Sequence, residues 1–178
     1  QFAALIREHV RQYPSAPEWE GDRARVLDAI HDNMSREVPD LLDEIRGIAK
    51  GAGLPFRDLL GLSFWIEVLQ ATTGFGCSLI GFSGTQEGTI LGKNSDHDLP
   101  AVRYLAQQLV EGEDDGSSFT FLRGTFVGTT STRAGVNSVG LALCGAALIP
   151  VETNWDGVPI MVTIDQILRQ CGTVDEAI

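Results

Sequence analysis

The sequence predicts an α+β fold, more specifically a layered αββα arrangement, and three observations lead to that prediction. Apolar residues recur at helical spacing through the first part of the chain, up to residue 70. Between residues 77 and 148 the pattern changes to short apolar runs separated by polar, glycine-containing stretches, as in consecutive antiparallel hairpins. Helical spacing then returns at 159–170. Because the hairpins follow one another without intervening helices, a parallel βαβ fold is not expected.

Four helices are expected before the hairpins. Pro14 interrupts the first, and Pro39 suits the opening turn of the third, where a backbone N–H has no helical partner in any case. The third helix should end at Gly51 or Gly53, because glycine is common just beyond the last turn of a helix. The other three helices are expected at 2–13, 22–36 and 56–70.

Five strands and two helices are expected in the later part of the chain. The stretch SGTQEG separates the first two strands and has glycines and polar residues where a hairpin turn needs them. A helix at 159–170 is followed by another that begins within TVDEAI. We therefore divide the chain into a helical N-terminal segment, 1–76, and a sheet-and-helix part, 77–178. The strands are expected at 77–82, 88–94, 117–123, 125–135 and after a turn within 135–148.

Composition excludes several classes of function. The net charge of −11 would repel nucleic acid, and the apolar runs are too short and glycine-rich to span a membrane. The three cysteines are an odd number without CxxC spacing, which argues against a disulfide framework or a zinc site and suits a reducing, cytoplasmic location. The three histidines lack paired metal-ligand spacing as well, so no metal and no cofactor are expected. These residues are Cys77, Cys144, Cys171, His9, His31 and His97.

The first predicted hairpin decides which polar groups lie beside Cys77. With the turn centred between Thr85 and Gln86, Cys77 faces Asn94, and alternation along the strand adds Asp96 to that face. A register shifted by one residue, or a bulge, would instead place Ser95 opposite Cys77, with Lys93 and His97 on its face. In either register a thiol lies beside polar groups.

A cysteine attacks as its thiolate, which is a small fraction of a free cysteine at neutral pH. A nearby Lys93 or His97 would raise that fraction, whereas Asp96 would serve by orienting a base. Cysteine is also among the most frequently buried residues, so an ordinary core position for Cys77 is the alternative to a nucleophile.

Four stretches of this sequence resemble the penicillin acyltransferase family, which forms amides from acyl-coenzyme A and belongs to the cysteine-type N-terminal-nucleophile (Ntn) hydrolases. The stretches occur in the family's order and spacing and extend through nearly all of the chain. They are DEIRGIAKGAG at 43–53, GC at 76–77, GTILGKNSD at 88–96 and GVNSVGLAL at 135–143.

The resemblance implies an Ntn-type αββα fold, or a shortened version of it, and self-cleavage between Gly76 and Cys77. The freed α-amine of Cys77, with an ordinary pKa of ~8, would then serve as base to its own thiol. By the same resemblance Asp96 would hold that amine and Asn94 would position the strand. Lys93 stands where some relatives carry an arginine, which implies a contact to substrate or to the thiolate.

The sequence departs from the family in two respects. Related amidases supply an oxyanion-binding asparagine near the position of Ala146 and Ala147, where this sequence has no side-chain amide. The family also continues beyond the point corresponding to Ile178, which implies either further protein or a shortened member. In an uncleaved, shortened member His97 would be the base, as in a thiol protease.

The expected function is cysteine-dependent acyl transfer through a Cys77 thioester. Its partners would be a small-molecule acyl donor, either a coenzyme A or carrier-protein thioester or an amide, and an amine acceptor, as in antibiotic-type biosynthesis. Hydrolysis of a small amide is the alternative, because the family carries out both reactions. A non-catalytic binding module is a second alternative. Half of an Ntn sheet sandwich would expose apolar surface that a homo-oligomer or a second chain could cover.

Overall fold

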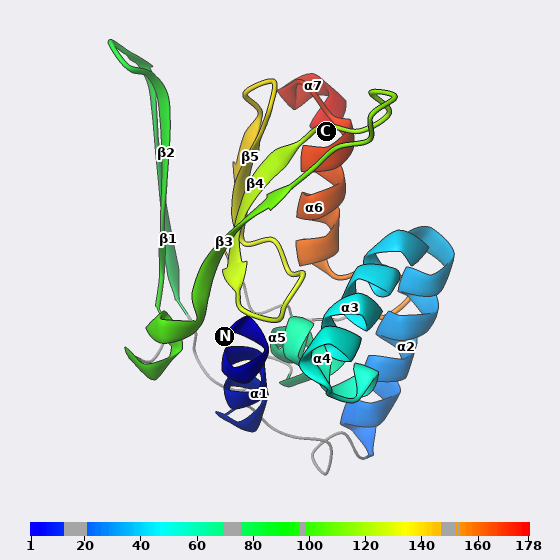
Figure 1. The fold of residues 1–178 in the computed structure, drawn as a ribbon. Helices are drawn as coiled ribbons and strands as arrows, with labels where there is room; N and C mark the ends of the chain where they lie inside the picture. Colours follow the sequence, from blue (N-terminus) through cyan, green and yellow to red (C-terminus); the bar gives the residue numbers. More distant parts are fainter. Residues whose placement is uncertain (13–20, 70–75, 97–98, 147–151, 153) are drawn as a thin grey trace. The chain divides into compact units, whose positions relative to one another are not determined.

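The computed structural model describes residues 1–12, 21–69, 76–96, 99–146, 152 and 154–178. It has a mixed α+β architecture with two antiparallel sheets, one of two strands and one of four (Figure 1). The chain forms two compact units, the first from residues 1–72, 126–131 and 150–159, the second from 73–125, 132–149 and 160–178. Each unit draws on several segments, and the division into 1–76 and 77–178 stays a prediction.

The first unit contains five helices among its described residues. The first three predicted helices are confirmed, and Gly53 ends the third in the left-handed conformation, with φ 67°. The fourth expected helix is instead two helices, because the backbone at Phe64 leaves helical geometry with φ −123° and ψ 30°. The helices are α1 (Phe2–Gln12), α2 (Asp22–Glu37), α3 (Pro39–Ala52), α4 (Phe56–Ser63) and α5 (Trp65–Leu69).

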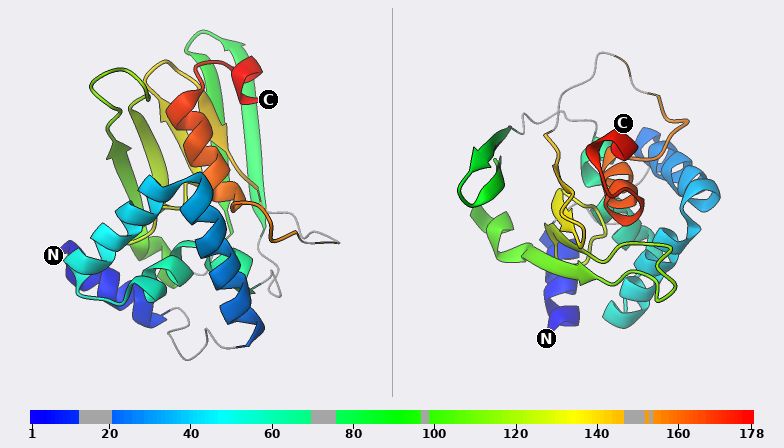
Figure 2. Two further views of the ribbon diagram at one scale, coloured as in Figure 1. Left: turned by 90° about the vertical axis from the view of Figure 1, so that its right-hand side faces the viewer. Right: turned by 90° about the horizontal axis from the view of Figure 1, so that it is seen from above.

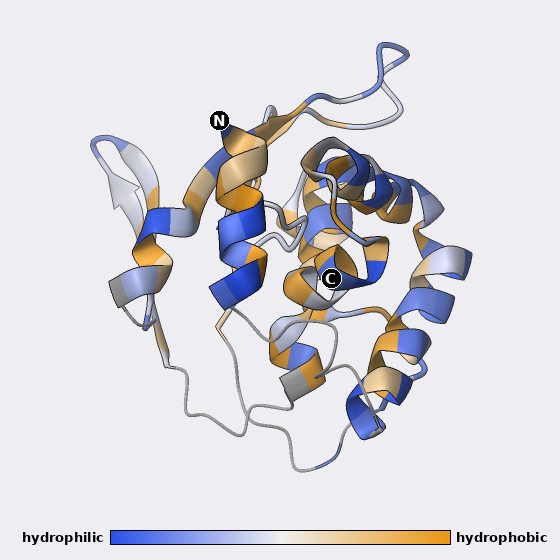
Figure 3. Ribbon diagram, turned by 60° about the horizontal axis from the view of Figure 1, so that its bottom comes forward, coloured by the Kyte–Doolittle hydropathy of each residue, from blue (hydrophilic) through white to orange (hydrophobic). Residues whose placement is uncertain are grey.

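The helices of this unit bury their apolar sides together, and Figure 3 shows hydrophobic and hydrophilic residues separated on the helices. Helix α1 is tied to the unit by polar contacts as well. The Arg7 guanidinium donates to the Ala52 carbonyl at 2.8 Å, and Nδ1 of the buried His9 donates to the Val127 carbonyl at 2.7 Å. The spacing of Phe2, Leu5 and Ile6 in the sequence predicts that Phe2 lies on the apolar side of this helix, but it is 74% exposed. Fully buried core residues include Leu27, Ile30, Met34, Ile45 and Leu59.

The second unit contains the four-stranded sheet, whose strands lie in chain order and are antiparallel where β5 pairs with β4 and with β6. Figure 2 shows α6 (Ile160–Gln170) against this sheet, and the short α7 (Val174–Ala177) follows it. Phe121 on the sheet packs against Ile164 and Leu168 of α6. The strands are β3 (Leu105–Val110), β4 (Phe121–Phe126), β5 (Ala134–Asn137) and β6 (Ala142–Cys144).

Several expectations for this part are wrong in detail. Strand β3 was not expected, and β4 bridges the end of one expected strand and the start of the next. Residues 127–133 are not a strand, because Gly128 turns the chain at φ 88°. The spacing of Ile160 with Ile164 and Ile167 predicts that Ile160 faces the inner side of α6, but it is 61% exposed.

The side of the sheet away from the α6 core is apolar and exposed. Leu122 is 39% exposed and its neighbour in β4, Phe121, is buried, as expected from strand alternation. Val136 pairs with Leu122 and is also exposed, as are Leu105 and Leu109 of β3. The sheet thus has one face in the core, and its other face exposes apolar side chains within the described part of the chain.

The two-stranded sheet is a hairpin of β1 (Cys77–Thr85) and β2 (Gly88–Ser95). A 3₁₀ helix, Leu99–Tyr104, precedes β3. No helix in the described part of the chain is both long and apolar enough to cross a membrane.

Candidate functional site

The hairpin pairs Cys77 directly with Ser95, and the same register continues to Phe82 opposite Ile90. The expected pairing of Cys77 with Asn94 is therefore wrong by one residue. The alternative register, with Ser95 opposite the cysteine, is confirmed.

A displaced turn and a bulge together produce this register. Thr85 pairs with Gly88, so the turn consists of Gln86 and Glu87 and lies one residue later than expected. Between Thr85 and Phe82 the pairing shifts by one residue, and Gly84 takes a positive φ of 71° there. Such a bulge lets two residues of one strand oppose a single residue of the other. Glycine accepts the required backbone conformation without strain.

The observed register sorts the predicted site residues onto two faces of the hairpin. Lys93 lies on the same face as Cys77 and Ser95, because residues two apart on a strand point the same way. Asn94 and Asp96 lie on the opposite face. His97 lies outside the described residues.

Asp96 lies against the junction between Gly76 and Cys77. Its backbone N–H donates to the Gly76 carbonyl oxygen at 2.9 Å, which extends the hairpin register by one more pair. A Cβ atom placed on Gly76 would lie only 2.3 Å from Oδ2 of Asp96, so the carboxylate occupies the space that a side chain would need. The Asn94 amide donates to the other carboxylate oxygen, Oδ1, at 2.6 Å. Asn94 thus orients the carboxylate that lies beside the Gly76–Cys77 peptide.

Lys93 joins the hairpin to the end of β6. Its ammonium donates to the Gly145 carbonyl oxygen, and the Gly145 N–H in turn donates to the Arg133 carbonyl at 3.1 Å. Ala146 is exposed and offers no polar side chain, as the sequence indicated, and Ala147 lies outside the described residues. The contact to Gly145 joins residues 52 positions apart, and no local pattern in the sequence signalled it.

The three cysteines are all free and half-buried. Sγ of Cys171 donates to the backbone carbonyl of Glu176 at 3.3 Å. Cys77 is therefore not a fully enclosed core residue.

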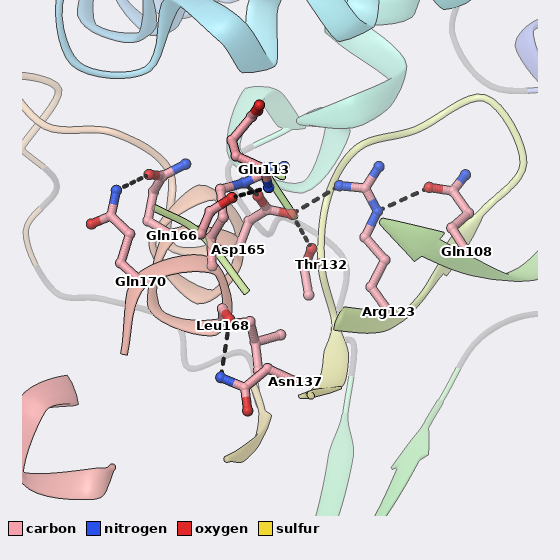
Figure 4. A network of polar contacts seen from close by, with 11 residues as sticks. Gln108, Glu113, Arg123, Thr132, Asn137, Asp165, Gln166, Leu168 and Gln170 are labelled. Atoms are coloured by element: carbon pink, nitrogen blue, oxygen red, sulfur yellow. Dashed lines mark hydrogen bonds and ion pairs between the residues drawn. The ribbon is translucent and has the colours of Figure 1, made fainter. Parts of the chain in front are cut away.

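A buried polar network in the same unit was not predicted from the sequence (Figure 4). Asp165 on α6 is fully buried and accepts a hydrogen bond from Arg123 at 2.8 Å and another from Thr132 at 2.8 Å. Nε of Arg123 donates to Gln108 of β3 at 2.9 Å, and Arg169 reaches the second Asp165 oxygen at 3.4 Å. This network joins two strands and a loop to α6. An aspartate within the apolar stripe of a helix was the available signal for it.

Asn137, within the predicted motif GVNSVGLAL, is a second buried polar junction. Its amide donates to the carbonyl of Leu168 at 3.1 Å, in the last turn of α6, and to that of Cys171 at 2.8 Å, just beyond the helix. Its oxygen accepts from the N–H of Leu141 at 2.9 Å and of Val139 at 3.3 Å in the β5–β6 turn. This motif residue therefore has a structural role in linking the turn to the helix.

Within the described part of the chain, no three His, Cys, Asp or Glu side chains gather in a way that would hold a metal ion. Sequence comparison finds no matching family model and no curated protein with significant similarity to this chain.

Proposed function

We propose that the chain is a cysteine-dependent acyl-transfer enzyme that works through a thioester on Cys77. The observation that carries this proposal is the position of Asp96 beside the Gly76–Cys77 peptide. A carboxylate held there by Asn94 has no evident role in a plain hairpin, since it is exposed and pairs with no basic group among the described residues.

Cleavage of the Gly76–Cys77 bond would give the Asp96 carboxylate a role. The Cys77 thiol adds to the Gly76 carbonyl carbon, the C–N bond breaks, and the thiol proton passes to the departing nitrogen. Water then hydrolyses the resulting thioester, which frees the thiol and leaves a carboxylate on Gly76. The new α-amine of Cys77 would form next to Asp96, which would hold it as the base for the thiol.

In the cleaved enzyme the Cys77 thiolate would attack an amide or a thioester of a small-molecule donor. The acyl group would then pass from sulfur to an amine, forming an amide, with a coenzyme A or carrier-protein thioester as donor. Hydrolysis of a small amide is a second candidate, and the half-buried position of Cys77 favours it, because a thioester there is not sealed from water. Both reactions pass through an acyl thioester on Cys77, and they differ in the acyl donor and in the acceptor.

We also propose that the sheet belongs to an Ntn-type αββα arrangement. One face of the four-stranded sheet packs against α6, and the other exposes Leu105, Leu109, Leu122 and Val136. Two sheets packed face to face need apolar residues on both inner faces, which this face supplies. A second β layer, from a second copy or another chain, would bury it.

Intact mass spectrometry tests the proposal. The purified protein is measured before and after addition of 4-nitrophenyl acetate, with Cys77→Ala as the test variant and Cys144→Ala as the matched control. We expect fragments that break between Gly76 and Cys77, and one acetyl group on the fragment that begins with Cys77. The Cys144→Ala variant should give the same result. The Cys77→Ala variant should show neither the cleavage nor the acetyl group. Acetylation of an uncut chain would support Cys77 as the nucleophile but contradict the α-amine as its base. Absence of acetylation at Cys77 would contradict the proposal as a whole.

A further inference from the structure

Thioester formation needs a group that stabilises the negative charge on the carbonyl oxygen under attack. In enzymes this group is a hydrogen-bond donor or a cation held in place before the reaction, and its removal slows the reaction by ~10²–10³. For Cys77 the donor must lie on the face of the hairpin that carries the thiol.

Three hydrogen-bond donors in this part of the structure already have partners. The Gly145 N–H donates to the Arg133 carbonyl, and the Asp96 N–H donates to the Gly76 carbonyl. The Asn94 amide lies on the opposite face of the hairpin and donates to Asp96. Of these three donors, the Asp96 N–H serves only the Gly76 carbonyl oxygen that Cys77 would attack in the cleavage step, and the other two are bonded to other groups.

Lys93 differs from these groups in both position and capacity. It lies on the thiol face, on the strand opposite Cys77 and diagonal to it, which is within reach of a long side chain. Its half-buried side chain is anchored by the Gly145 carbonyl oxygen. An ammonium has three N–H donors, so one anchoring bond leaves capacity to donate to a second acceptor.

We propose that the Lys93 ammonium binds the oxyanion that forms when Cys77 attacks an acyl donor, an inference that rests on the proposed function. Sγ bonds to the carbonyl carbon, and the electron pair of the C=O double bond moves to the oxygen, where Lys93 donates to it. On collapse the pair returns and the leaving group departs, as an alkoxide or thiolate, or as an amine that has taken up the thiol proton. The Gly145 carbonyl holds the ammonium in place throughout.

Two reactions of the same thiol test this role. Acetylation of Cys77 by 4-nitrophenyl acetate passes through an oxyanion, whereas alkylation by iodoacetamide is a displacement at a saturated carbon and forms none. Lys93→Met removes the ammonium and keeps the length of the side chain, and Lys93→Arg retains a cation. The sequence contains one other lysine, Lys50, which is exposed on α3, so Lys50→Met is the matched control.

We expect Lys93→Met to slow acetylation by ~10²-fold or more while alkylation changes little. Lys93→Arg should be intermediate, and Lys50→Met should match the unchanged protein in both reactions. Acetylation retained in Lys93→Met would overturn the inference. An equal loss of acetylation and alkylation would overturn it too, because Lys93 would then act on the thiol or on the fold. If the protein without substitutions shows no acetylation at Cys77, the proposed function is wrong. That outcome differs from the two results above, which would overturn only the role of Lys93.

Discussion

The backbone N–H of Asp96 donates to the Gly76 carbonyl oxygen at 2.9 Å, and the Asp96 carboxylate fills the space beside the Gly76 Cα. Two different parts of one residue therefore fix the peptide that precedes Cys77. The backbone bond continues the strand pairing, whereas the carboxylate prevents any residue larger than glycine from fitting at position 76 without a shift.

Gly76→Ala should displace the Asp96 carboxylate without unfolding the hairpin. The added Cβ would lie 2.3 Å from Oδ2, and a short side chain at the end of a strand can rotate away. We expect loss of cleavage between residues 76 and 77 by intact mass, with little change in Tm. Gly47→Ala is the control, since nothing lies within 4 Å of its added Cβ, and this helical position should gain ~0.5–1 kcal/mol. Normal cleavage in Gly76→Ala would show that the carboxylate position does not matter.

Asp96→Asn should separate folding from activity. The backbone N–H to Gly76 remains, and the side chain is exposed, so the free energy of unfolding should change by less than ~1 kcal/mol. A neutral amide binds an ammonium less well, so Cys77 acetylation should fall by ~10²-fold or more. Stopped-flow release of 4-nitrophenolate measures this rate. Equal rates in both proteins would remove Asp96 from the mechanism.

Asp165→Asn should strongly destabilise the protein. Asp165 and Arg123 are 0% and 1% exposed, and removal of the carboxylate charge leaves a buried guanidinium without its counter-ion. The expected loss is ~3–5 kcal/mol, measured by urea unfolding. Asp28→Asn is the control, because Asp28 pairs with Arg57 at the surface and should contribute ~1 kcal/mol or less. Similar effects of the two substitutions would mean that the buried pair is not a major stabilising contact.

Asn137→Ala should destabilise the protein by ~2–4 kcal/mol, because it removes four hydrogen bonds at a buried site. Asn137→Asp keeps the acceptor for the turn but places a carboxylate against the carbonyls of Leu168 and Cys171. Both variants should unfold at lower urea concentration. Asn154→Ala, which removes an exposed bond to the Asp156 N–H, should have a small effect. Unchanged stability in Asn137→Ala would contradict the structural role of this motif residue.

Asp58→Asn should stabilise the protein at neutral pH. Burial raises the pKa of Asp58, so the folded protein binds the proton more tightly than the unfolded chain does. Stability is then highest when Asp58 is protonated and is lost as the pH rises through the raised pKa. The substitution mimics the protonated form, so its benefit should disappear as the pH falls below the ordinary aspartate range. Urea unfolding across that pH range measures the difference, and a benefit independent of pH would be inconsistent with this cause.

Helices were the most predictable part of the fold. Apolar periodicity with Pro39 at one end and Gly53 at the other defines α3. Strand β3 was missed because its sequence does not place apolar residues inward and polar residues outward. Its leucines, Leu105 and Leu109, face outward, whereas Gln108 reaches the buried Arg123. Tertiary contacts decide that orientation, and they are not visible in the sequence of the strand.

The candidate site was predictable in its residue types but not in its geometry. Alternation along strands correctly indicated that one register would unite Cys77 with Lys93 and the other with Asn94. The choice between them depended on a bulge, which the sequence marks only by a glycine. The partner of Lys93, a backbone carbonyl at Gly145, has no side chain and so no signature in the sequence.

The bulge at Gly84 also bears on how this hairpin can change through evolution. The hairpin tip lies about 26 Å along the strand from Cys77, yet the number of residues there determines which side chains share the face of the thiol. Deletion of a single residue at the tip would exchange Lys93 for Asn94 as a neighbour of Cys77, with no substitution near either residue. Insertions and deletions in this surface turn are therefore a route to new chemistry, and the same operation offers protein engineers a one-codon switch of the site.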